Sequence, residues 1–403
     1  MPLIQTFEYQ TLTIGQNGFQ QRHFDYLARH APSKYFQVQH RAIRFKNYVG
    51  ALQVGDLTIE ILPKIDQQEG NTKLWRDVLL DMLRYCRLLK IEPVGTAQLA
   101  LKHHSILDLY YEIFLAEVER ILSKGLFFNY RSITSNQKSW KGSLQFAAHL
   151  RHNWLHKERF FTKHDTYDTI NIYNQIISAT LQLLDQLQLS APLRLKLNQV
   201  KAQFPFLPKK SFSTADFESL PFNRQNQHYR NAIQIAQLLL LQNRPAIRVG
   251  EDRLLALMFD MNLLFEEYIF RQLCLLRTKD LRISRQARKA FWNRQYIRPD
   301  ILLQISEKRY IIDTKWKILT KAQPAMTDLQ QAFVYGQYFN AKTSLLLYPK
   351  HSDLENLRPQ SFDISGDYTC GLFFAKVLEH HALNLKIGQE IIQFLVDDPL
   401  KEE

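Results

Sequence analysis

The chain has 403 residues, of which 45% are hydrophobic and 23% charged, a globular balance with room for two or three domains. No stretch of about 18 consecutive apolar residues occurs, and the N-terminus lacks a basic region followed by an apolar run. The three cysteines (Cys86, Cys274 and Cys370) are far apart and odd in number, which argues against a disulfide framework and a cysteine-based zinc site and fits a reducing compartment. We therefore expect a cytoplasmic protein with no membrane partner.

The net charge of +13 is unevenly distributed. Residues 1–245 hold 30 Lys and Arg against 19 Asp and Glu, whereas residues 246–403 hold 22 against 20. A basic chain indicates a polyanionic partner such as nucleic acid, and a merely solubilising surface is the alternative.

The first 245 residues divide into a β-rich region at 1–100 and a mainly helical region at 101–245. Residues 35–65 alternate in part and contain a turn at Gly55-Asp56, which predicts strands, and a polar linker follows at 66–72. Residues 126–165 are mixed. Apolar residues at helical spacing predict four helices, of which the second has Ser105 as N-cap and Gly125 as its stop: 73–90, 106–125, 171–189 and 231–242.

From residue 246 onward the pattern changes to alternating helices and strands. We predict a long helix at 252–277, an antiparallel strand pair at 300–305 and 310–316, a helix at 326–340 and a strand at 343–350. This order is typical of a mixed α/β core.

The predicted strand pair places acidic side chains next to a lysine. A four-residue turn, Ser306–Arg309, sets Asp300 opposite Lys315, so that Asp300 and Asp313 become diagonal neighbours on one face, roughly 7–8 Å apart. Two converging carboxylates suit Mg²⁺, and a lysine beside them suits phosphodiester hydrolysis. The alternative is a weak cluster of surface ion pairs.

These residues carry a resemblance to a known family. Pro299-Asp300 and Asp313-Thr314-Lys315 resemble the PD-(D/E)XK nuclease motif. Five further segments are similar to the McrC family, the nuclease subunit of McrBC-type, 5-methylcytosine-dependent (type IV) restriction systems: "IEILPKI", "GLFFNYR", "WKGSLQF", "MNLLFEEYIF" and "DLQQAFVYG". The resemblance implies a mixed α/β fold in which an N-terminal β-rich, partner-docking region and a helical region precede a PD-(D/E)XK restriction-endonuclease-like domain at 246–403.

The resemblance also implies roles for individual residues. Asp300 and Asp313 match the metal ligands, here for Mg²⁺, and Lys315 matches the catalytic lysine. Glu266 matches the acid of the helix before the strand pair, although its neighbour Glu267 is the alternative. Two residues of the following helix match a Gln-x-x-x-Tyr pattern that supports nuclease sites: Gln331 and Tyr335.

Two basic zones are candidates for binding DNA. Residues 277–298 contain eight Lys and Arg and one acid, interleaved with aromatic residues, and lead directly to Asp300. The candidate DNA-binding residues in this zone are Arg285, Arg288, Lys289, Arg294 and Arg298. The second zone, 124–163, has the same charge count and suits either DNA or an acidic protein partner.

No G-x-x-x-x-G-K-[ST] motif is present, so we do not expect this chain to bind nucleotide through a P-loop. The resemblance implies a separate AAA+ GTPase ring of McrB type, which binds GTP, recognises methylated DNA and is stimulated by this subunit. One nuclease centre cuts one strand, so we expect two complexes to combine for double-strand cleavage. The alternatives are a non-catalytic adaptor for DNA and an NTPase, and a free-standing repair or recombination nuclease.

Overall fold

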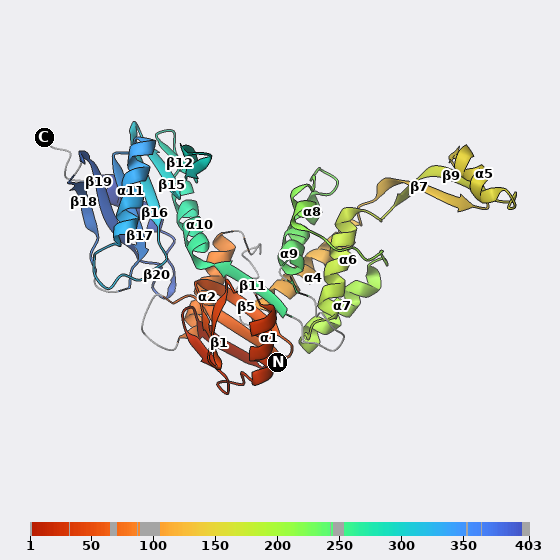
Figure 1. The fold of residues 1–403 in the computed structure, drawn as a ribbon, viewed down its shortest axis with the longest axis horizontal. Coiled ribbons are helices and arrows are strands. Elements are labelled where there is room, and N and C mark those ends of the chain that lie inside the picture. Colours follow the sequence, from red (N-terminus) through yellow and green to blue (C-terminus); the bar gives the residue numbers. More distant parts are fainter. Residues whose placement is uncertain are drawn as a thin grey trace. The chain divides into compact units, whose positions relative to one another are not determined.

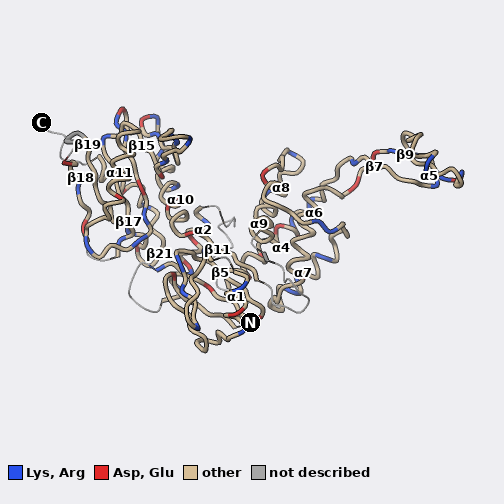
Figure 2. The backbone as a smooth tube through the Cα atoms, in the orientation of Figure 1, with Lys and Arg blue, Asp and Glu red and all other residues tan. Residues whose placement is uncertain are grey.

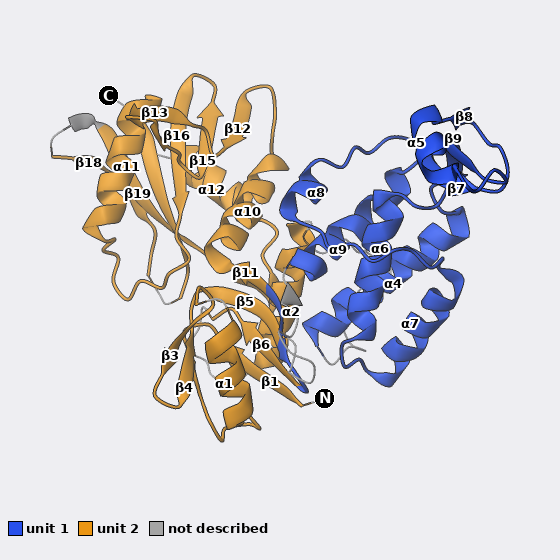
Figure 3. Cartoon of the chain, turned by 45° about the vertical axis from the view of Figure 1, so that its right-hand side comes forward, with its two compact units in different colours: residues 1, 53–56, 103–257 blue, residues 2–52, 57–102, 258–403 orange. Residues whose placement is uncertain are grey.

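The computed structural model describes the chain over residues 2–31, 33–64, 71–86, 88, 105–241, 243–244, 254–351, 354–363 and 365–396. The chain forms two compact units (Figure 3). Unit 1 takes in residues 53–56 and 103–257, and unit 2 takes in residues 2–52, 57–102 and 258–403. The sequence-based boundaries near 100 and 245 stay a prediction.

The N-terminal part of the chain is β-rich, as predicted. Its elements are β1 (Leu3–Phe7), β2 (Thr11–Thr13), α1 (Gln21–His30), β3 (Phe36–Gln39), β4 (Ala42–Phe45), β5 (Tyr48–Val54), β6 (Leu57–Leu62) and α2 (Thr72–Tyr85). The predicted turn at Gly55-Asp56 joins β5 to β6, and Gly55 supplies its positive φ of 55°. A five-stranded sheet has the order β1-β6-β5-β11-β10, and its β6 is buried at every position. Most of the predicted linker, residues 66–70, lies outside the described residues.

Helices dominate unit 1. They are α4 (Ile106–Lys124), α6 (Ile172–Asp185), α7 (Ala191–Gln203), α8 (Thr214–Glu218), η2 (Gln227–Tyr229) and α9 (Arg230–Leu241). The predicted ends of α4 are confirmed, because Asp108 N–H donates to Ser105 Oγ at 3.1 Å and Gly125 has a φ of 90°. The other three predicted helices correspond to α2, α6 and α9, while residues 87, 89–90 and 242 of the predicted ranges lie outside the described residues.

A hairpin projects from the helices of unit 1 (Figure 1), and we call residues 129–168 the arm. It consists of β7 (Asn129–Gln137), β8 (Ser143–Leu144), α5 (Phe146–Asn153) and β9 (Phe160–Asp168). Its root is held by buried polar groups. Asn174 Nδ2 donates to Phe127 O at 2.9 Å and to Thr169 O at 2.8 Å, while Tyr229 Oη accepts from Phe127 N–H and donates to Asn174 Oδ1. These bonds tie both strands of the arm to the helices.

The long helix predicted at 252–277 is wrong in its first half. Residues Leu254–Asp260 form β11, which belongs to the N-terminal sheet with β10 (Asn243–Arg244), and α10 begins only at Met261 and ends at Cys274. The run "LLALMFD" is apolar almost throughout, so its periodicity cannot separate a buried strand from a buried helix. Asp260 marks the change, since its side chain caps α10 by accepting from Asn262 N–H at 2.9 Å.

The C-terminal part of unit 2 is built on a six-stranded mixed sheet. Its order is β12 (Leu281–Arg285), β15 (Ile301–Ile305), β16 (Lys308–Thr314), β17 (Thr343–Pro349), β19 (Ser365–Ala375) and β18 (Leu357–Phe362). The remaining elements are β13 (Lys289–Trp292), β14 (Gln295–Ile297), α11 (Met326–Phe339), β20 (Leu378–Glu379), β21 (Ala382–Leu383) and α12 (Ile387–Val396). The predicted mixed α/β class is confirmed.

The two helices beside β16 cover opposite faces of this sheet. Ile311 packs against Tyr335 and Phe339 of α11, whereas Trp316 packs against Phe265 of α10. Since side chains alternate along a strand, odd-numbered residues near the end of β16 face α11 and even-numbered residues face α10. None of the helices in the described part of the chain has the length and hydrophobicity that crossing a bilayer requires.

Candidate active site

The hairpin of β15 and β16 brings Asp300 and Asp313 together in a register that differs from the predicted one. Ile305 pairs with Lys308 and Ile301 with Ile312, so the turn has two residues instead of four. Ser306 makes this tight turn possible with a positive φ of 53°. Extending the ladder by one pair sets Asp300 opposite Asp313, and not opposite Lys315. A shift of two residues keeps both acids on one face.

Asp300 holds the end of β16 in place. Its Oδ2 accepts from Thr314 N–H at 2.8 Å and from Thr314 Oγ1 at 2.9 Å. Thr314 was not among the predicted site residues, although it lies within the quoted motif. The bonds leave the other carboxylate oxygen of Asp300 available beside Asp313.

Asp313 is a buried acid next to a second acid and a lysine. It is 1% exposed, and burial raises its pKa to about 6, with the negative charge of Asp300 adding to the shift and Lys315 opposing it. Its Oδ2 forms an ion pair with Lys315 Nζ at 2.7 Å. A buried carboxylate between a second acid and an amine is well placed to share a cation with that second acid.

Lys315 is held between Asp313 and α11. Its Nζ donates to Gln331 Oε1 at 2.9 Å, and Gln331 Nε2 donates to Tyr335 Oη at 2.6 Å. Burial alone lowers the pKa of this amine, but the carboxylates of Asp313 and Asp300 outweigh it and raise the pKa, which keeps the lysine charged. The structure thus joins Lys315, Gln331 and Tyr335 in one hydrogen-bonded chain.

The two adjacent acids of α10 have different surroundings. Glu266 is 4% exposed and accepts from Arg285 Nε at 2.9 Å and from Gln286 Nε2 at 3.0 Å. Burial and the charge of Asp300 raise its pKa. Glu267 forms ion pairs with Arg271 and, like Glu266, with Arg285. Glu266 is the more deeply buried of the two acids, and the choice between them stays a prediction.

The predicted basic zone at 277–298 forms β12, β13 and β14. The guanidinium of Arg285 is engaged by both acids of α10, and Lys289 Nζ donates to Tyr338 O at 2.5 Å. Arg288 lies over the ring of Tyr296, 4.5 Å from its centroid. Arg294 and Arg298 are exposed, so these two and Arg288 are the better placed to meet a phosphate backbone.

A second ion pair lies beside the site and was missed from the sequence. Lys317 Nζ bonds to Asp328 Oδ2, which also accepts from Tyr348 Oη at 2.8 Å. Burial alone raises the pKa of Asp328, but these hydrogen bonds outweigh it and lower the pKa. The available signal was that Asp328 begins the segment "DLQQAFVYG".

The donor set fits Mg²⁺ better than a metal that needs a full protein cage. Within the described residues, no group of three or more His, Cys, Asp and Glu side chains is arranged to hold a metal ion. Mg²⁺ commonly takes one or two carboxylates and fills its remaining positions with water and substrate phosphate. Asp300 and Asp313, whose carboxylates lie close enough for the charge of Asp300 to raise the pKa of Asp313, are the two residues that match this requirement.

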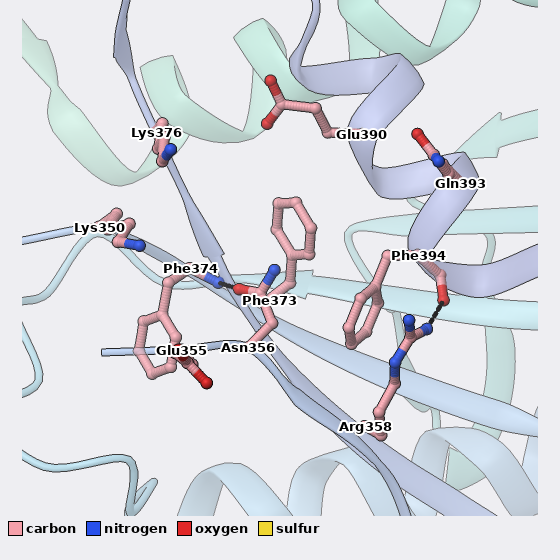
Figure 4. A pocket seen from close by; sticks show the side chains of 10 residues that line it. All are labelled: Lys350, Glu355, Asn356, Arg358, Phe373, Phe374, Lys376, Glu390, Gln393 and Phe394. Atoms are coloured by element: carbon pink, nitrogen blue, oxygen red, sulfur yellow. Dashed lines mark hydrogen bonds between the residues drawn. The ribbon is translucent and has the colours of Figure 1, made fainter. Parts of the chain in front are cut away.

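A separate cavity of about 440 Å³ lies at the ends of β17 and β19 (Figure 4). Phe373 and Phe394 of its lining pack edge-on with ring centroids 5.4 Å apart, and Arg358 Nη1 donates to Phe394 O at 2.9 Å. The acids and the lysine of the candidate site do not line this cavity.

Comparisons with known proteins place this geometry in context. A family model described as "McrBC 5-methylcytosine restriction system component" matches residues 43–349. A search of curated proteins gives no match.

Two solved structures share the fold. One chain of a refined half-complex from a tetradecameric assembly of Thermococcus gammatolerans McrB AAA+ hexamers with bound McrC is 17% identical, with a TM-score of 0.70 over 98% of this chain and 99% of that chain. A chain from the cryo-EM structure of the Thermococcus gammatolerans McrBC complex is 20% identical, with a TM-score of 0.51 over 68% of this chain and 87% of that chain.

Proposed function

The chain belongs to the family of McrBC 5-methylcytosine restriction system components, and from this membership and the geometry of its site we propose that it is the Mg²⁺-dependent DNA endonuclease subunit of a modification-dependent restriction complex. The observation that carries the proposal is the meeting of Asp300, Asp313 and Lys315 at the end of one hairpin. A buried acid of raised pKa beside another acid and a lysine is typical of a catalytic centre.

Asp300 and Asp313 are the residues that would hold Mg²⁺. When bound, the metal supplies a water of lowered pKa and stabilises negative charge on the phosphate. Lys315 keeps a positive charge at the same place, where it orients a water or offsets charge on the phosphate. Gln331 and Tyr335 fix the direction of the Lys315 amine, and Thr314 fixes Asp300.

We propose that the partner is an AAA+ GTPase ring of McrB type, with which this subunit docks and whose GTPase it stimulates. The arm of unit 1 supports this role because it carries large apolar side chains that are exposed. Trp154 is 76% exposed and Leu155 is 85% exposed, and Arg151, Lys157 and Arg159 are their near neighbours in the chain. Lysine and arginine positions are also marked along the backbone near α5 (Figure 2). Hot spots of protein interfaces are enriched in tryptophan, tyrosine and arginine.

The arm assignment predicts that Trp154→Ser together with Leu155→Ser weakens binding to the GTPase ring by about 10-fold or more. The double substitution removes exposed apolar area at the tip of the arm and leaves the buried bonds at its root intact. Binding is measured by sedimentation or light scattering with the purified ring. Leu195→Ser, at an exposed leucine of α7 in the same unit, is the matched control. Equal binding by both variants and wild type would place the docking surface elsewhere.

Cleavage of methylated and unmethylated plasmid with Mg²⁺ tests the function directly. The chain is assayed alone and with the candidate GTPase and GTP. Asp313→Asn is expected to lower cleavage by more than about 100-fold without loss of folding, because it removes a proposed ligand and relieves repulsion with Asp300. Glu307→Gln, at an exposed acid in the turn of the same hairpin, is the control.

Each outcome separates the alternatives. Cleavage that needs the GTPase, GTP and Asp313 supports the restriction subunit. Cleavage by the chain alone favours a free-standing nuclease. The absence of cleavage with intact binding of DNA and GTPase favours a non-catalytic adaptor.

A further inference from the structure

A buried acid, Glu8, lies at the end of the N-terminal strand β1 and contacts Trp316, the residue after Lys315. Glu8 directly follows β1 and is 1% exposed. Its Oε1 accepts from Trp316 Nε1 at 2.7 Å and from Lys64 backbone N–H at 3.1 Å, whereas its Oε2 has no hydrogen-bond partner within the described residues. Burial of a carboxylate with one oxygen unsatisfied is costly, so packing alone does not account for an acid at this position.

Trp316 connects this acid to α10, one of the two helices of the site. It follows Lys315 directly and is 4% exposed. Its ring packs edge-on against Phe265 at a centroid distance of 5.0 Å, and Phe265 precedes Glu266 on α10. Lys315 and Trp316 are adjacent residues that directly follow β16, so the buried indole of Trp316 fixes the backbone next to Lys315.

The N-terminal part of unit 2 also forms hydrogen bonds with the start of α10. Asn47 Nδ2 donates to Asp260 Oδ1 at 3.0 Å, and Met261 N–H donates to Asn47 O at 2.9 Å. Asp260 is the N-cap of α10, the helix that carries Glu266. One module therefore contacts the beginning of the Glu266 helix and the end of the Lys315 strand.

We propose that Glu8 and Trp316 form a positioning pair through which the N-terminal strands set the geometry of the nuclease site. This inference rests on the proposed nuclease function. Neither residue touches the reacting groups. The pair acts on Lys315, whose contacts at 2.7 Å to Asp313 and 2.9 Å to Gln331 depend on the path of the backbone at residues 315–316. Displacement by about 1 Å costs such a site on the order of 100-fold in rate.

The pair also couples the position of the N-terminal strands to the end of β16. A shift of β1 relative to the six-stranded sheet would change the Glu8–Trp316 contact, since this hydrogen bond joins the end of β1 to the residue that follows Lys315. The bond is buried and directional, so it transmits a displacement that loose apolar packing would absorb.

The test uses the full chain with its GTPase partner, and compares cleavage at saturating DNA with DNA affinity and GTPase stimulation. Glu8→Met removes the acceptor and Trp316→Phe removes the indole donor. Each is expected to lower the cleavage rate by about 10- to 100-fold while DNA affinity and GTPase stimulation change by less than about 3-fold. Glu8→Gln keeps a side-chain carbonyl for the indole and is expected to stay within about 3-fold of wild type.

Two further variants sharpen this test. Combining Glu8→Met with Trp316→Phe is expected to cost no more than either change alone, because both remove the same hydrogen bond. Glu60→Met is the matched control. Glu60 is equally buried in the same sheet, but it accepts from Gln5 within the N-terminal strands. It is expected to lower thermal stability without a selective loss of cleavage.

The outcomes separate this inference from the function on which it rests. If wild type fails to cleave, or if Asp313→Asn cleaves equally well, the nuclease function and the positioning pair both fall. If wild type cleaves through Asp313 while Glu8→Met and Trp316→Phe cleave at the wild-type rate, only the positioning pair is overturned. Parallel losses of cleavage, DNA affinity and GTPase stimulation would likewise reduce the pair to a general folding contact.

Discussion

Asp313 of the candidate site and Glu8 of the N-terminal module are equally buried carboxylates with different neighbours. Each is 1% exposed, and burial raises the pKa of both. Asp313 lies beside a second acid and 2.7 Å from a lysine amine, whereas Glu8 is bound by two uncharged donors, an indole and a backbone N–H. The different neighbours of these two acids show that a raised pKa alone does not mark a catalytic acid. The neighbouring charges, which can recruit a cation and a phosphate, distinguish the two.

The largest effect is expected from removing the Lys315 amine, the positive charge that lies beside Asp313 and not beside Glu8. Lys315→Met should lower Mg²⁺-dependent cleavage by about 100- to 1,000-fold, because the site loses the charge that offsets the phosphate. Single-turnover cleavage with the GTPase partner measures it. Lys308→Met, at an exposed lysine of the same strand, serves as the control. If Lys315→Met cleaves within about 3-fold of the wild-type rate, the lysine beside Asp313 does not contribute to cleavage and does not distinguish Asp313 from Glu8.

The next effect concerns the stability that Glu8 contributes as a function of pH. Burial raises the pKa of Glu8 from 4.5 to about 7, and the negative charge of Asp260 adds to the shift, while hydrogen bonds from Trp316 and Lys64 oppose it. Between these values the folded state binds a proton that the unfolded state has released. The free energy of unfolding therefore falls as pH rises from 4.5 through 7, by up to roughly 3 kcal/mol.

Glu8→Gln removes this component, because a glutamine carries no titrating proton. The melting temperature of the variant relative to wild type should therefore increase between pH 5 and pH 8. Glu307→Gln, which changes an exposed acid, should show no such trend. A difference for Glu8→Gln that stays constant with pH would mean that Glu8 is not protonated in the folded protein at neutral pH.

A smaller effect is expected at the residue that orients the lysine. Gln331→Leu should lower cleavage by about 10- to 100-fold, since it removes the acceptor 2.9 Å from Lys315 Nζ while keeping the side-chain volume. The neighbouring Gln330 is exposed, so Gln330→Leu is a matched control on the same helix. Equal rates for the two variants would show that Asp313 alone suffices to hold the lysine.

The smallest effect is expected one hydrogen bond farther from the lysine. Tyr335→Phe removes the hydroxyl that accepts from Gln331 Nε2 and leaves the aromatic ring in its packing against Ile311. Cleavage should fall by only a few-fold, because Gln331 keeps its contact with Lys315. A loss larger than that of Gln331→Leu would point to a direct role for the Tyr335 hydroxyl.

Local patterns predicted several helices, α4 and α11 among them, and the strands β15 to β17, and they failed where apolar runs lack a period. The ends of α4 followed from Ser105 and Gly125, since caps act on their own turn. The stretch 254–260 was assigned to a helix because its residues are apolar almost throughout, whereas its pairing in the N-terminal sheet makes it a strand. The hairpin was found but its turn was two residues too long, because Ser306 adopts a left-handed conformation that sequence does not signal strongly.

Asp300, Asp313 and Lys315 could be predicted from the sequence alone, because they lie on or next to one hairpin whose alternation brings them to one face whether its turn has two residues or four. The contacts of Gln331 with Lys315, of Glu266 with Arg285 and Gln286, and of Glu8 with Trp316 became visible only in the folded chain. These contacts join segments that are distant in the chain. Their geometry depends on how helices and sheets pack, which local periodicity does not encode.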